Sequence, residues 1–380
     1  MRAAVIGAGF VGRAHIEALR RLGIEIAGLL GSSPERTREQ SKSLGLPHGY
    51  DAPSDLVRDS SVDVVHICTP NYLHFAECEM ALEAKKHVLC EKPLALNSRE
   101  TARLVELARG LGRVGAVAHN LRYYPMCQEA RALLGRGTIG EPRLVHGSYL
   151  QDWLLYPSDW NWRLDPQAGG TMRTVADVGT HWLDMMMWIT GKRVTELCAD
   201  LATLIPVRER PSGAVETFQQ RKGTDFERLR IDTEDYASVL LRFEAGIRGV
   251  MTVSQVSPGR KNRFWFEIDG SEGSLAWDGE QPNLLWMGER REMNRELVKD
   301  PALMSPEARG FAVYPAGHAE GYPDTFVGLF KQFYAYLEQS DLSAPRPFPS
   351  FTDGHLGLLL CEAIAQSARE RRWVQVPAMV

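Results

Sequence analysis

The chain has 380 residues, a length that favours two domains, each with its own core, over one small stapled domain. Hydrophobic residues make up 44% and charged residues 24%, which is usual for a folded globular protein and excludes a disordered or collagen-like chain. The formal net charge is -4, so no overall basic field attracts nucleic acid or an anionic membrane. Small molecules are the expected partners.

Cysteine usage and the apolar segments bear on the compartment. The six cysteines form no C-x-x-C pair and show no dense spacing, which argues against a disulfide scaffold or a zinc ribbon and favours reduced thiols. The segment after Met1 is broken by Gly7 and Gly9 and is too short for a signal peptide. The apolar stretch 356–364 is too short for a membrane span. We therefore expect a cytoplasmic protein without a membrane partner.

Strand-like and helix-like patterns alternate over the first third of the chain. Apolar runs predict strands at residues 3–7, 24–30, 62–68, 87–90 and 114–118. Helical patterns lie between them at about 11–21, 34–44, 73–84 and 99–111. Strands that are apolar on both faces and alternate with helices are typical of a doubly wound parallel sheet. We expect an α/β domain over residues 1–122.

The remainder, residues 123–380, is expected to form an α+β domain that binds substrate and mediates oligomerisation. Two-residue alternation at 237–257 and 263–277 predicts a large, mainly antiparallel sheet with one face covered by helices. The covering helices are expected at 126–134, 177–190, 325–338 and 353–371. The charged stretch 207–235 and the loop 294–321 are interpreted as surface insertions.

A glycine-rich turn follows the first predicted strand and opens a helix, reading Gly7-Ala8-Gly9-Phe10-Val11-Gly12. The first glycine permits a tight turn, the second lets the backbone approach a pyrophosphate, and the third allows close packing of helix and strand. In this strand-turn-helix context the pattern predicts a dinucleotide-binding turn of the Rossmann type, with a plain glycine-rich turn as the alternative.

The end of the second predicted strand bears on the choice of cofactor. An NAD enzyme of this type usually has a carboxylate there, and this chain has Gly31. Ser32, Ser33 and Arg36 follow and offer donors to a 2'-phosphate, which predicts that NADP is tolerated and leaves a preference for it open. In the alternative, the two serines only cap the next helix and the arginine is solvated.

Two further segments follow predicted strands at the edge where such sheets bind ligands. The first carries Thr69, Pro70, Asn71 and His74, and the second carries Glu91 and Lys92. A lysine that directly follows an apolar strand is a candidate for chemistry, although a plain surface lysine is the alternative.

In the second domain, Asp177 and His181 are four residues apart on a predicted helix, so they share a face. A carboxylate that holds one imidazole nitrogen leaves the other free for acid-base work, and a helix N-terminus near His181 favours its neutral form. A helix cap beside a core histidine is one alternative, and a metal site that adds Asp184 is another. No other ligand cluster is visible, and no metal is expected.

An aromatic segment at residues 149–163 interleaves tryptophans with carboxylates and amides, including Asp152, Trp153 and Trp160. Aromatic faces stack on sugar C–H groups while polar side chains bind hydroxyls, so a polyhydroxylated substrate suits this segment. A hydrophobic plug between domains is the alternative. His318 and the pair Lys261-Asn262 are further pocket candidates.

Taken together, the glycine turn, the Glu91-Lys92-Pro93 segment and the Asp177/His181 pair resemble the Gfo/Idh/MocA family of oxidoreductases. The resemblance implies that Lys92 is the catalytic lysine, His181 the acid-base group and Asp177 its accompanying acid. It also implies the residues that line the cofactor: Thr69, Pro70, Asn71, His74, Glu91, Asn120, Trp162 and Arg163. The substrate candidates, besides the catalytic three, are Arg122, Asp152, Trp153, Trp160 and His318.

The function expected from this resemblance is hydride transfer between NAD(P) and a secondary alcohol of a sugar, anhydrosugar or cyclitol. The aromatic segment and the His318 segment are similar to members that act on levoglucosan and related sugars. Relatives that cleave glycosidic bonds by transient oxidation keep an NAD-dependent glycosidase open as an alternative. A non-catalytic NAD(P) sensor is a third hypothesis, and it leaves the Lys92, Asp177 and His181 set without a purpose. Homodimers or homotetramers that cover the open sheet face are expected.

Overall fold

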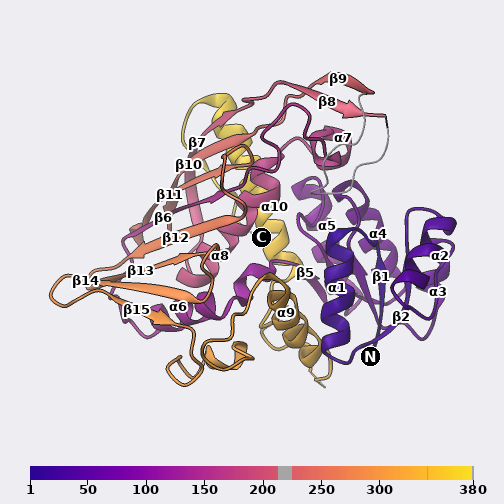
Figure 1. Ribbon diagram of the computed structural model, residues 1–380, viewed down its shortest axis with the longest axis horizontal. Coiled ribbons are helices and arrows are strands. Elements are labelled where there is room, and N and C mark those ends of the chain that lie inside the picture. The colour runs from indigo at the N-terminus through magenta and orange to yellow at the C-terminus, as the bar shows by residue number, and fades with distance from the viewer. Residues whose placement is uncertain (213–224, 340, 379–380) are drawn as a thin grey trace. The chain divides into compact units, whose positions relative to one another are not determined.

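A computed structural model describes residues 1–212, 225–339 and 341–378 (Figure 1). The chain divides into two compact units. Unit 1 comprises Met1–Asn120, Gln167–Gly170 and Phe326–Leu358, and unit 2 comprises Leu121–Pro166, Thr171–Thr325 and Leu359–Val380. Within the described residues, no helix is both long and apolar enough to cross a bilayer.

Unit 1 is built on a five-stranded sheet with the order β2-β1-β3-β4-β5, and every pairing is parallel. The strands are β1 (Arg2–Ile6), β2 (Glu25–Leu30), β3 (Val64–Ile67), β4 (His87–Cys90) and β5 (Gly115–Val117). The helices are α1 (Phe10–Arg21), α2 (Pro34–Ser43), α3 (Pro53–Arg58), α4 (Asn71–Glu83) and α5 (Ser98–Gly110). The predicted strands and alternating helices are confirmed, because the central strands are buried on both faces.

The strand order reverses beside β1, since β2 lies on one side of it and β3 on the other. In open parallel sheets, ligands bind outside the carboxyl ends of the strands at such a reversal. The turns that follow β1 and β3 are therefore the expected place for a cofactor.

Two helices from late in the chain contribute to unit 1, α9 (Tyr322–Leu337) and the first part of α10 (Phe351–Glu370). Phe351 packs against β5, where a Cβ atom at Gly115 would come within 2.5 Å of its ring. This glycine is therefore required by close packing.

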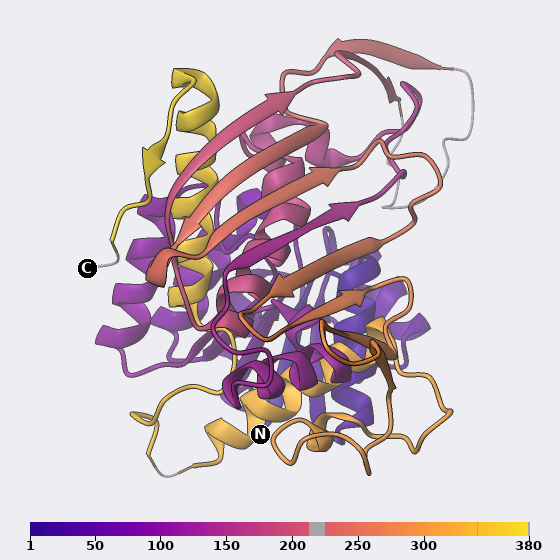
Figure 2. The same ribbon diagram turned by 90° about the vertical axis from the view of Figure 1, so that its left-hand side faces the viewer.

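Unit 2 is built on a nine-stranded sheet with the order β15-β14-β13-β12-β6-β11-β10-β7-β16, and β6 with β11 is its one parallel pairing among the described residues. The strands of this sheet are β6 (Leu144–Leu150), β7 (Val194–Ala202), β10 (Tyr236–Phe243), β11 (Arg248–Ser254), β12 (Arg263–Asp269), β13 (Gly273–Asp278), β14 (Leu284–Glu289), β15 (Arg295–Val298) and β16 (Val374–Gln375). The predicted large, mainly antiparallel sheet is confirmed (Figure 2).

Helices cover one face of this sheet, namely α6 (Pro125–Gly135), α8 (Thr180–Thr190) and the later part of α10 (Figure 2). Alternate residues of each strand point to this covered face, as Val239 and Leu241 of β10 do, and they are buried. Leu240 lies on the opposite, open face and pairs in register with Val250 of β11. The face away from these helices carries partly exposed apolar side chains, among them Leu240 and Val250.

The interpretation of residues 207–235 and 294–321 as surface insertions is wrong in part. Strands β8 (Val207–Pro211) and β9 (Phe226–Arg230) form a separate two-stranded sheet, and residues 213–224 of this stretch lie outside the described residues. The Arg208 and Asp235 side chains are fully buried, as is the Lys299–Glu320 ion pair of the later loop. Charged side chains are usually solvated, but these neutralise one another inside the unit.

Candidate active site

The turn after β1 requires glycine at two positions because the protein itself fills the space. Gly7 has φ +90°, and a Cβ atom there would lie 2.6 Å from the Cys68 carbonyl oxygen. A Cβ atom at Gly12 would lie 2.0 Å from the Gly7 oxygen. The first and third glycines of the predicted motif thus allow the turn and the close packing of α1.

Gly9 differs from these two glycines, since no atom of the described residues outside its own stretch of chain lies within 4 Å of a Cβ atom built on it. It caps α1, whose first turn contains Phe10, Val11 and Gly12 and no acidic residue. An open approach to the backbone at the positive end of a helix suits a pyrophosphate, so these residues fit a dinucleotide.

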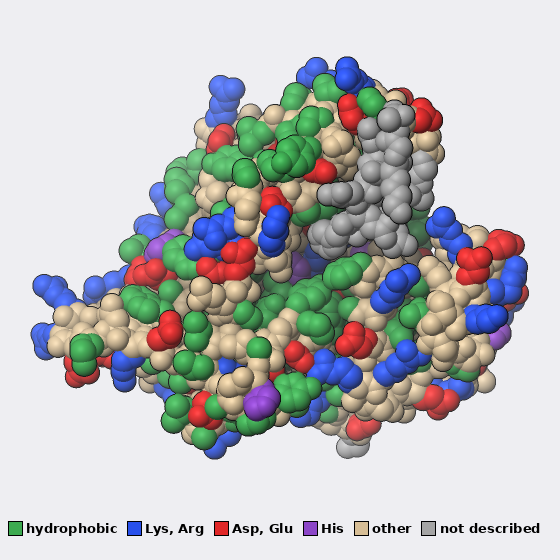
Figure 3. Space-filling view, viewed as in Figure 1, with side chains coloured by type: hydrophobic (Ala, Val, Ile, Leu, Met, Phe, Trp, Pro, Cys, Tyr) green, Lys and Arg blue, Asp and Glu red, His purple; other side chains and the backbone are tan. Residues whose placement is uncertain are grey.

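The residues after β2 were interpreted either as a site for a 2'-phosphate or as a helix cap, and they support both interpretations in part. The Ser33 hydroxyl caps α2 by accepting a hydrogen bond from the Arg36 amide at 3.3 Å, which supports the capping alternative for this serine. Ser32 and the Arg36 side chain are exposed. A Cβ atom at Gly31 would lie 2.9 Å from Gln40 and 3.0 Å from Thr37, so a carboxylate there would need these neighbours to move. Side chains of both charge signs cover the surface over α2 and α3 (Figure 3).

The turns after β3 and β4 are joined by His74. Its Nδ1 atom lies 2.7 Å from the Pro93 carbonyl oxygen, and its Nε2 atom lies 2.8 Å from that of Thr69. Carbonyl oxygens only accept, so the His74 ring is placed to donate to both turns. Asn71 donates to the Gly169 carbonyl, and the peptide bond between Lys92 and Pro93 is cis. Five of the predicted residues are thus brought together at this edge: Thr69, Asn71, His74, Glu91 and Lys92.

Glu77 of α4 is a functional candidate that sequence reasoning missed. Its carboxyl accepts a hydrogen bond from the Thr69 hydroxyl at 2.5 Å. Burial raises the pKa of Glu77 to about 7, although this hydrogen bond acts in the opposite direction. A carboxyl group with a pKa near neutral pH therefore contacts the turn after β3.

Glu91 ends a buried chain of side chains that holds the strand end before Lys92. The His15 Nε2 atom lies 3.1 Å from a Glu91 carboxylate oxygen, and the other carboxylate oxygen accepts from the Lys92 amide at 3.3 Å. The two Nδ1 atoms of His15 and His66 lie 3.0 Å apart, and His66 Nε2 lies 2.9 Å from the Tyr334 hydroxyl. Both histidines are completely buried.

The charges in this chain fix the direction of its hydrogen bonds. Burial lowers the pKa of His66 well below its usual value and raises that of Tyr334 well above it, so both are neutral. Burial would raise the pKa of Glu91, but the His15 hydrogen bond and nearby positive charges lower it overall. Tyrosine therefore donates to His66, His66 donates to His15, and His15 donates to the carboxylate.

In unit 2, Asp177 lies in a π-helical turn, Val175–Gly179, that runs directly into α8. Gly179, at the N-cap position of α8, has helical dihedral angles. The expected free helix N-terminus near His181 is therefore absent, and the positive helix end does not act directly on this ring. His181 itself is buried.

The Asp177 carboxylate is held from two sides. Its Oδ1 atom pairs with Arg163 Nε at 3.2 Å, and its Oδ2 atom accepts a hydrogen bond from Gln255 at 2.8 Å. The Arg163 guanidinium also lies over the Trp162 ring, 4.4 Å from its centroid. Of the two residues predicted to touch the cofactor, Arg163 thus contacts the predicted acid and Trp162 packs against Arg163. Gln255 was missed.

Arg122, a predicted substrate residue, forms a two-pronged ion pair with Asp184 and lies over the Trp188 ring. The metal alternative required the Asp184 carboxylate, which this guanidinium occupies. Among the described residues, Asp177, His181 and Asp184 form no cluster of possible metal ligands.

The aromatic segment is partly folded onto unit 2. Trp153 and Trp160 pack against a small cluster of Leu154, Leu164 and Ile231 while remaining partly exposed. The Trp153 indole donates to Gln151, and Gln151 donates to Asn262, which also accepts from the Tyr149 hydroxyl. Asp152 forms an ion pair with Lys261 at 2.7 Å. This is an aromatic surface with a dense set of amide and charged groups.

The two remaining candidates differ in exposure. Asn120 is buried in a 3-10 turn, Asn120–Tyr123, whereas His318 is exposed. The His318 backbone is held in place, because the buried Lys299 ammonium donates a hydrogen bond to its carbonyl oxygen at 2.8 Å.

The parallel sheet with its glycine turn at the strand reversal has the architecture of a dinucleotide-binding Rossmann domain, and the family model for residues 1–119 defines the class as an NAD-binding oxidoreductase. Two family models agree with this class: "Oxidoreductase family, NAD-binding Rossmann fold" matches residues 1–119, and "GFO/IDH/MocA C-terminal domain" matches residues 127–276. The chain therefore belongs to the Gfo/Idh/MocA family, as the sequence motifs predict.

Known relatives match the chain along its whole length. Levoglucosan dehydrogenase of Pseudarthrobacter phenanthrenivorans is 29% identical, and the alignment covers 98% of this chain and 97% of the relative. Myo-inositol 2-dehydrogenase of Thermotoga maritima is 27% identical over the full length of both chains. A solved structure of levoglucosan dehydrogenase with NADH and L-sorbose has a TM-score of 0.89 at 28% identity, covering 100% of this chain and 99% of that one.

Proposed function

We propose that this protein is an NAD(P)-dependent dehydrogenase that oxidises a secondary alcohol of a sugar, anhydrosugar or cyclitol, or catalyses the reverse reduction. The observation that carries this proposal is the end-to-end similarity to levoglucosan dehydrogenase, which has been solved with NADH and levoglucosan. The aromatic and amide groups around Trp153 and Asn262 support a polyhydroxylated substrate. Residues 1–122 serve as the dinucleotide-binding domain and residues 123–380 as the substrate-binding and oligomerisation domain.

The bound nicotinamide supplies hydride chemistry, and the protein supplies binding and proton transfer. The glycine turn, the residues from Thr69 to His74, Glu91, Asn120 and the Trp162-Arg163 pair hold the cofactor. His181 takes the proton of the substrate hydroxyl, and Asp177 orients its imidazole. Lys92 stabilises the negative charge that develops on the substrate oxygen. Arg122, Asp152, Trp153, Trp160 and His318 bind the substrate hydroxyls and ring.

A panel of sugars, anhydrosugars and inositols, assayed at 340 nm with each cofactor, tests the reaction. We expect one equivalent of reduced cofactor for each product formed. Product without reduced cofactor would instead identify the glycosidase chemistry, and tight cofactor binding without any turnover would identify a sensor.

For the cofactor, we propose that NADP is accepted as well as NAD. Ser32 and Arg36 are exposed beside Gly31, and no carboxylate there repels a 2'-phosphate. Among the described residues, Arg36 has no ion pair, unlike its neighbour Arg38, which contacts Glu35 and Asp51. Dissociation constants for both cofactors test this proposal, with Arg36→Ala against Arg38→Ala as the matched pair. NADP(H) binding at least tenfold weaker than NAD(H) binding in the parent protein would contradict it.

For assembly, we propose a homodimer or homotetramer in which a second copy covers the open face of the nine-stranded sheet. Leu240 and Val250 are 50% and 38% exposed on that face, which is unusual for paired strand residues in a monomer. Sedimentation at micromolar concentration tests this, and a monomer there would contradict it. Because all six cysteines are free thiols, we also propose a reducing, cytoplasmic location, which cell fractionation tests.

A further inference from the structure

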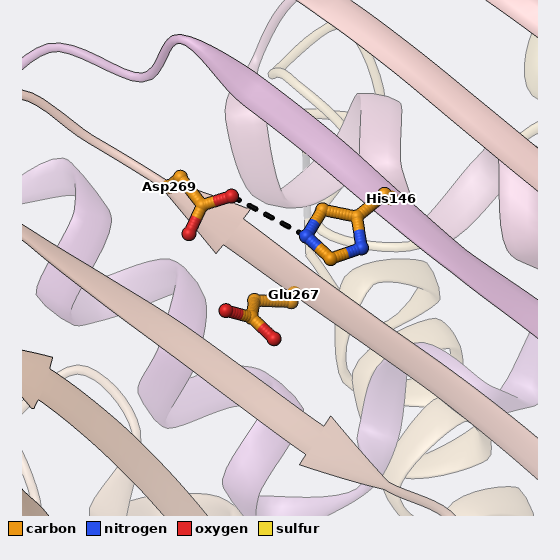
Figure 4. Close-up of side chains that lie close together, drawn as sticks. All are labelled: His146, Glu267 and Asp269. Atoms are coloured by element: carbon orange, nitrogen blue, oxygen red, sulfur yellow. Dashed lines mark ion pairs between the residues drawn. The ribbon is translucent and has the colours of Figure 1, made fainter.

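Three possible metal ligands meet on the open face of the nine-stranded sheet: His146 of β6 and Glu267 and Asp269 of β12 (Figure 4). None of them belongs to the proposed dehydrogenase site. In the sequence more than a hundred residues separate the histidine from the carboxylates, so no local motif announces the group.

The strand register brings these residues together. His146 and Glu267 are direct partners in the antiparallel pairing of β6 and β12. Asp269 lies two residues further along β12, so its side chain points to the same face. All three positions are therefore fixed by backbone hydrogen bonds.

The distances suit a small cation. The His146 Nε2 atom lies 3.3 Å from Asp269 Oδ2, and one ligand atom from each of the three residues lies within 4.8 Å of the others. In a tetrahedral zinc site with bonds of about 2.0–2.2 Å, ligand atoms lie about 3.3–3.6 Å apart. The histidine and aspartate already have this spacing, and rotation of the longer glutamate side chain brings in the third ligand.

The surroundings leave negative charge in this group. In the described part of the chain, no lysine or arginine pairs with either carboxylate. Arg248 of the neighbouring strand β11 donates instead to the Gly246 carbonyl oxygen. Two facing carboxylates with one imidazole are held here without a compensating cation.

Neighbouring side chains orient the ligands. The Ser274 hydroxyl donates to the second Asp269 oxygen at 2.6 Å and leaves Oδ2 directed at the imidazole. The His146 ring packs edge-on against Trp265, with 5.3 Å between centroids. Such outer contacts fix ligand geometry in known metal sites.

We propose that His146, Glu267 and Asp269 form a binding site for a divalent transition-metal ion such as Zn²⁺, with water completing its coordination. An imidazole nitrogen together with carboxylate oxygens favours such an ion over Mg²⁺ or Ca²⁺, which take oxygen ligands. All three side chains come from one chain, and the His146 and Asp269 side chains remain 34% and 26% exposed. The site therefore does not depend on the proposed reaction. It lies on the face that the proposed second copy would cover, since His146 pairs in register with Val250, but it needs no ligand from that copy.

Calorimetric titration of tag-free, chelator-treated protein with Zn²⁺ tests this site. We expect one Zn²⁺ per chain, and binding at least about tenfold weaker in His146→Ala, Glu267→Gln and Asp269→Asn. The last two changes keep side-chain shape, so they stay informative if the histidine variant folds poorly. Mg²⁺ and Ca²⁺ should bind more weakly than Zn²⁺.

The matched control is Asp200→Asn, which removes a carboxylate from an exposed position on β7 outside the group. It should bind Zn²⁺ as the parent does. Failure of the parent protein to bind Zn²⁺, or unchanged affinity in the Asp269→Asn and Glu267→Gln variants, would overturn the proposal. Dehydrogenase activity does not enter the test, so its result is separate from that of the proposed function.

Discussion

The two units place their functional side chains by different physical means. In unit 1, Gly7, Thr69 and Lys92 follow parallel strands, and backbone geometry together with a neutral histidine chain holds them. In unit 2, charged partners hold the corresponding groups, as Arg163 holds Asp177 and Asp184 holds Arg122. A site built on strand ends is visible in local sequence, whereas a site built on distant ion pairs is not.

The loss of unfolding free energy when one of these side chains is removed should also differ between the two units. Removing the neutral His15 donor leaves the Glu91 carboxylate with the Lys92 amide as a donor, whereas removing one partner of a buried ion pair leaves an uncompensated charge. Variants in the two units therefore measure whether this comparison holds.

The largest effect on stability is expected at Asp235 of unit 2, whose fully buried carboxylate pairs with Arg173 and Arg208. Asp235→Asn leaves two guanidinium groups without their counter-charge and should lower the free energy of unfolding by about 3–5 kcal/mol. Urea denaturation measures this. The control is Glu227→Gln, which breaks an exposed pair with Arg210 and should cost less than about 1 kcal/mol. Equal effects of the two changes would refute the importance of burial.

Next in size are the effects on catalysis. Lys92→Ala in unit 1 and His181→Ala in unit 2 should each lower kcat about 100-fold or more, the scale of an acid-base group. Steady-state kinetics with cofactor titration separates this loss from a loss of binding. Lys42→Ala, a change of an exposed lysine on α2, is the control. Parental rates in both alanine variants with intact cofactor binding would remove the assigned roles.

A smaller effect is expected from the buried chain of unit 1. His15→Ala removes the histidine that donates a hydrogen bond to the Glu91 carboxylate. This change should lower the free energy of unfolding by about 1–3 kcal/mol. It should also weaken cofactor binding, because Glu91 precedes Lys92. Tyr334→Phe acts at the far end of the chain and should cost only about 1 kcal/mol. Chemical denaturation compares the two variants. A larger loss of unfolding free energy in Tyr334→Phe than in His15→Ala would contradict the assigned order of hydrogen bonds, which runs from Tyr334 to Glu91.

The last prediction is a pH dependence that originates in Glu77. Its pKa is about 7 in the folded protein against an ordinary 4.5, so the folded state binds the extra proton between these values. The resulting stabilisation is fully present below pH 4.5 and is lost as the pH rises through 7. Unfolding free energies from about pH 5 to 7 should fall less steeply with rising pH in Glu77→Gln than in the parent protein. Parallel curves would mean that Glu77 has an ordinary pKa.

Local patterns in the sequence were enough to predict the sheet of unit 1, because glycines, apolar strands and helix caps act over a few residues. The Gly7 and Gly12 contacts and the strand ends at Thr69 and Glu91 follow from such patterns. The large antiparallel sheet was predicted for the same reason, since alternation sets which side chains are buried.

Pairings across long sequence distances could not be predicted. His15 and His66 are 51 residues apart, and Gln255 is 78 residues from Asp177. The one available signal was a histidine at a buried position in α1, which is ambiguous by itself. The π-helical turn before α8 was missed because its residues have an ordinary helical pattern. The buried charges around Asp235 were missed because charged stretches are usually solvated.

Isotope transfer tests the central claim most directly. The substrate found by the sugar panel is labelled with deuterium at the oxidised carbon, and the reduced cofactor is analysed by mass spectrometry. Direct hydride transfer predicts one deuterium in each molecule of reduced cofactor. Reduced cofactor without deuterium, or product formed with no reduced cofactor, would contradict the account.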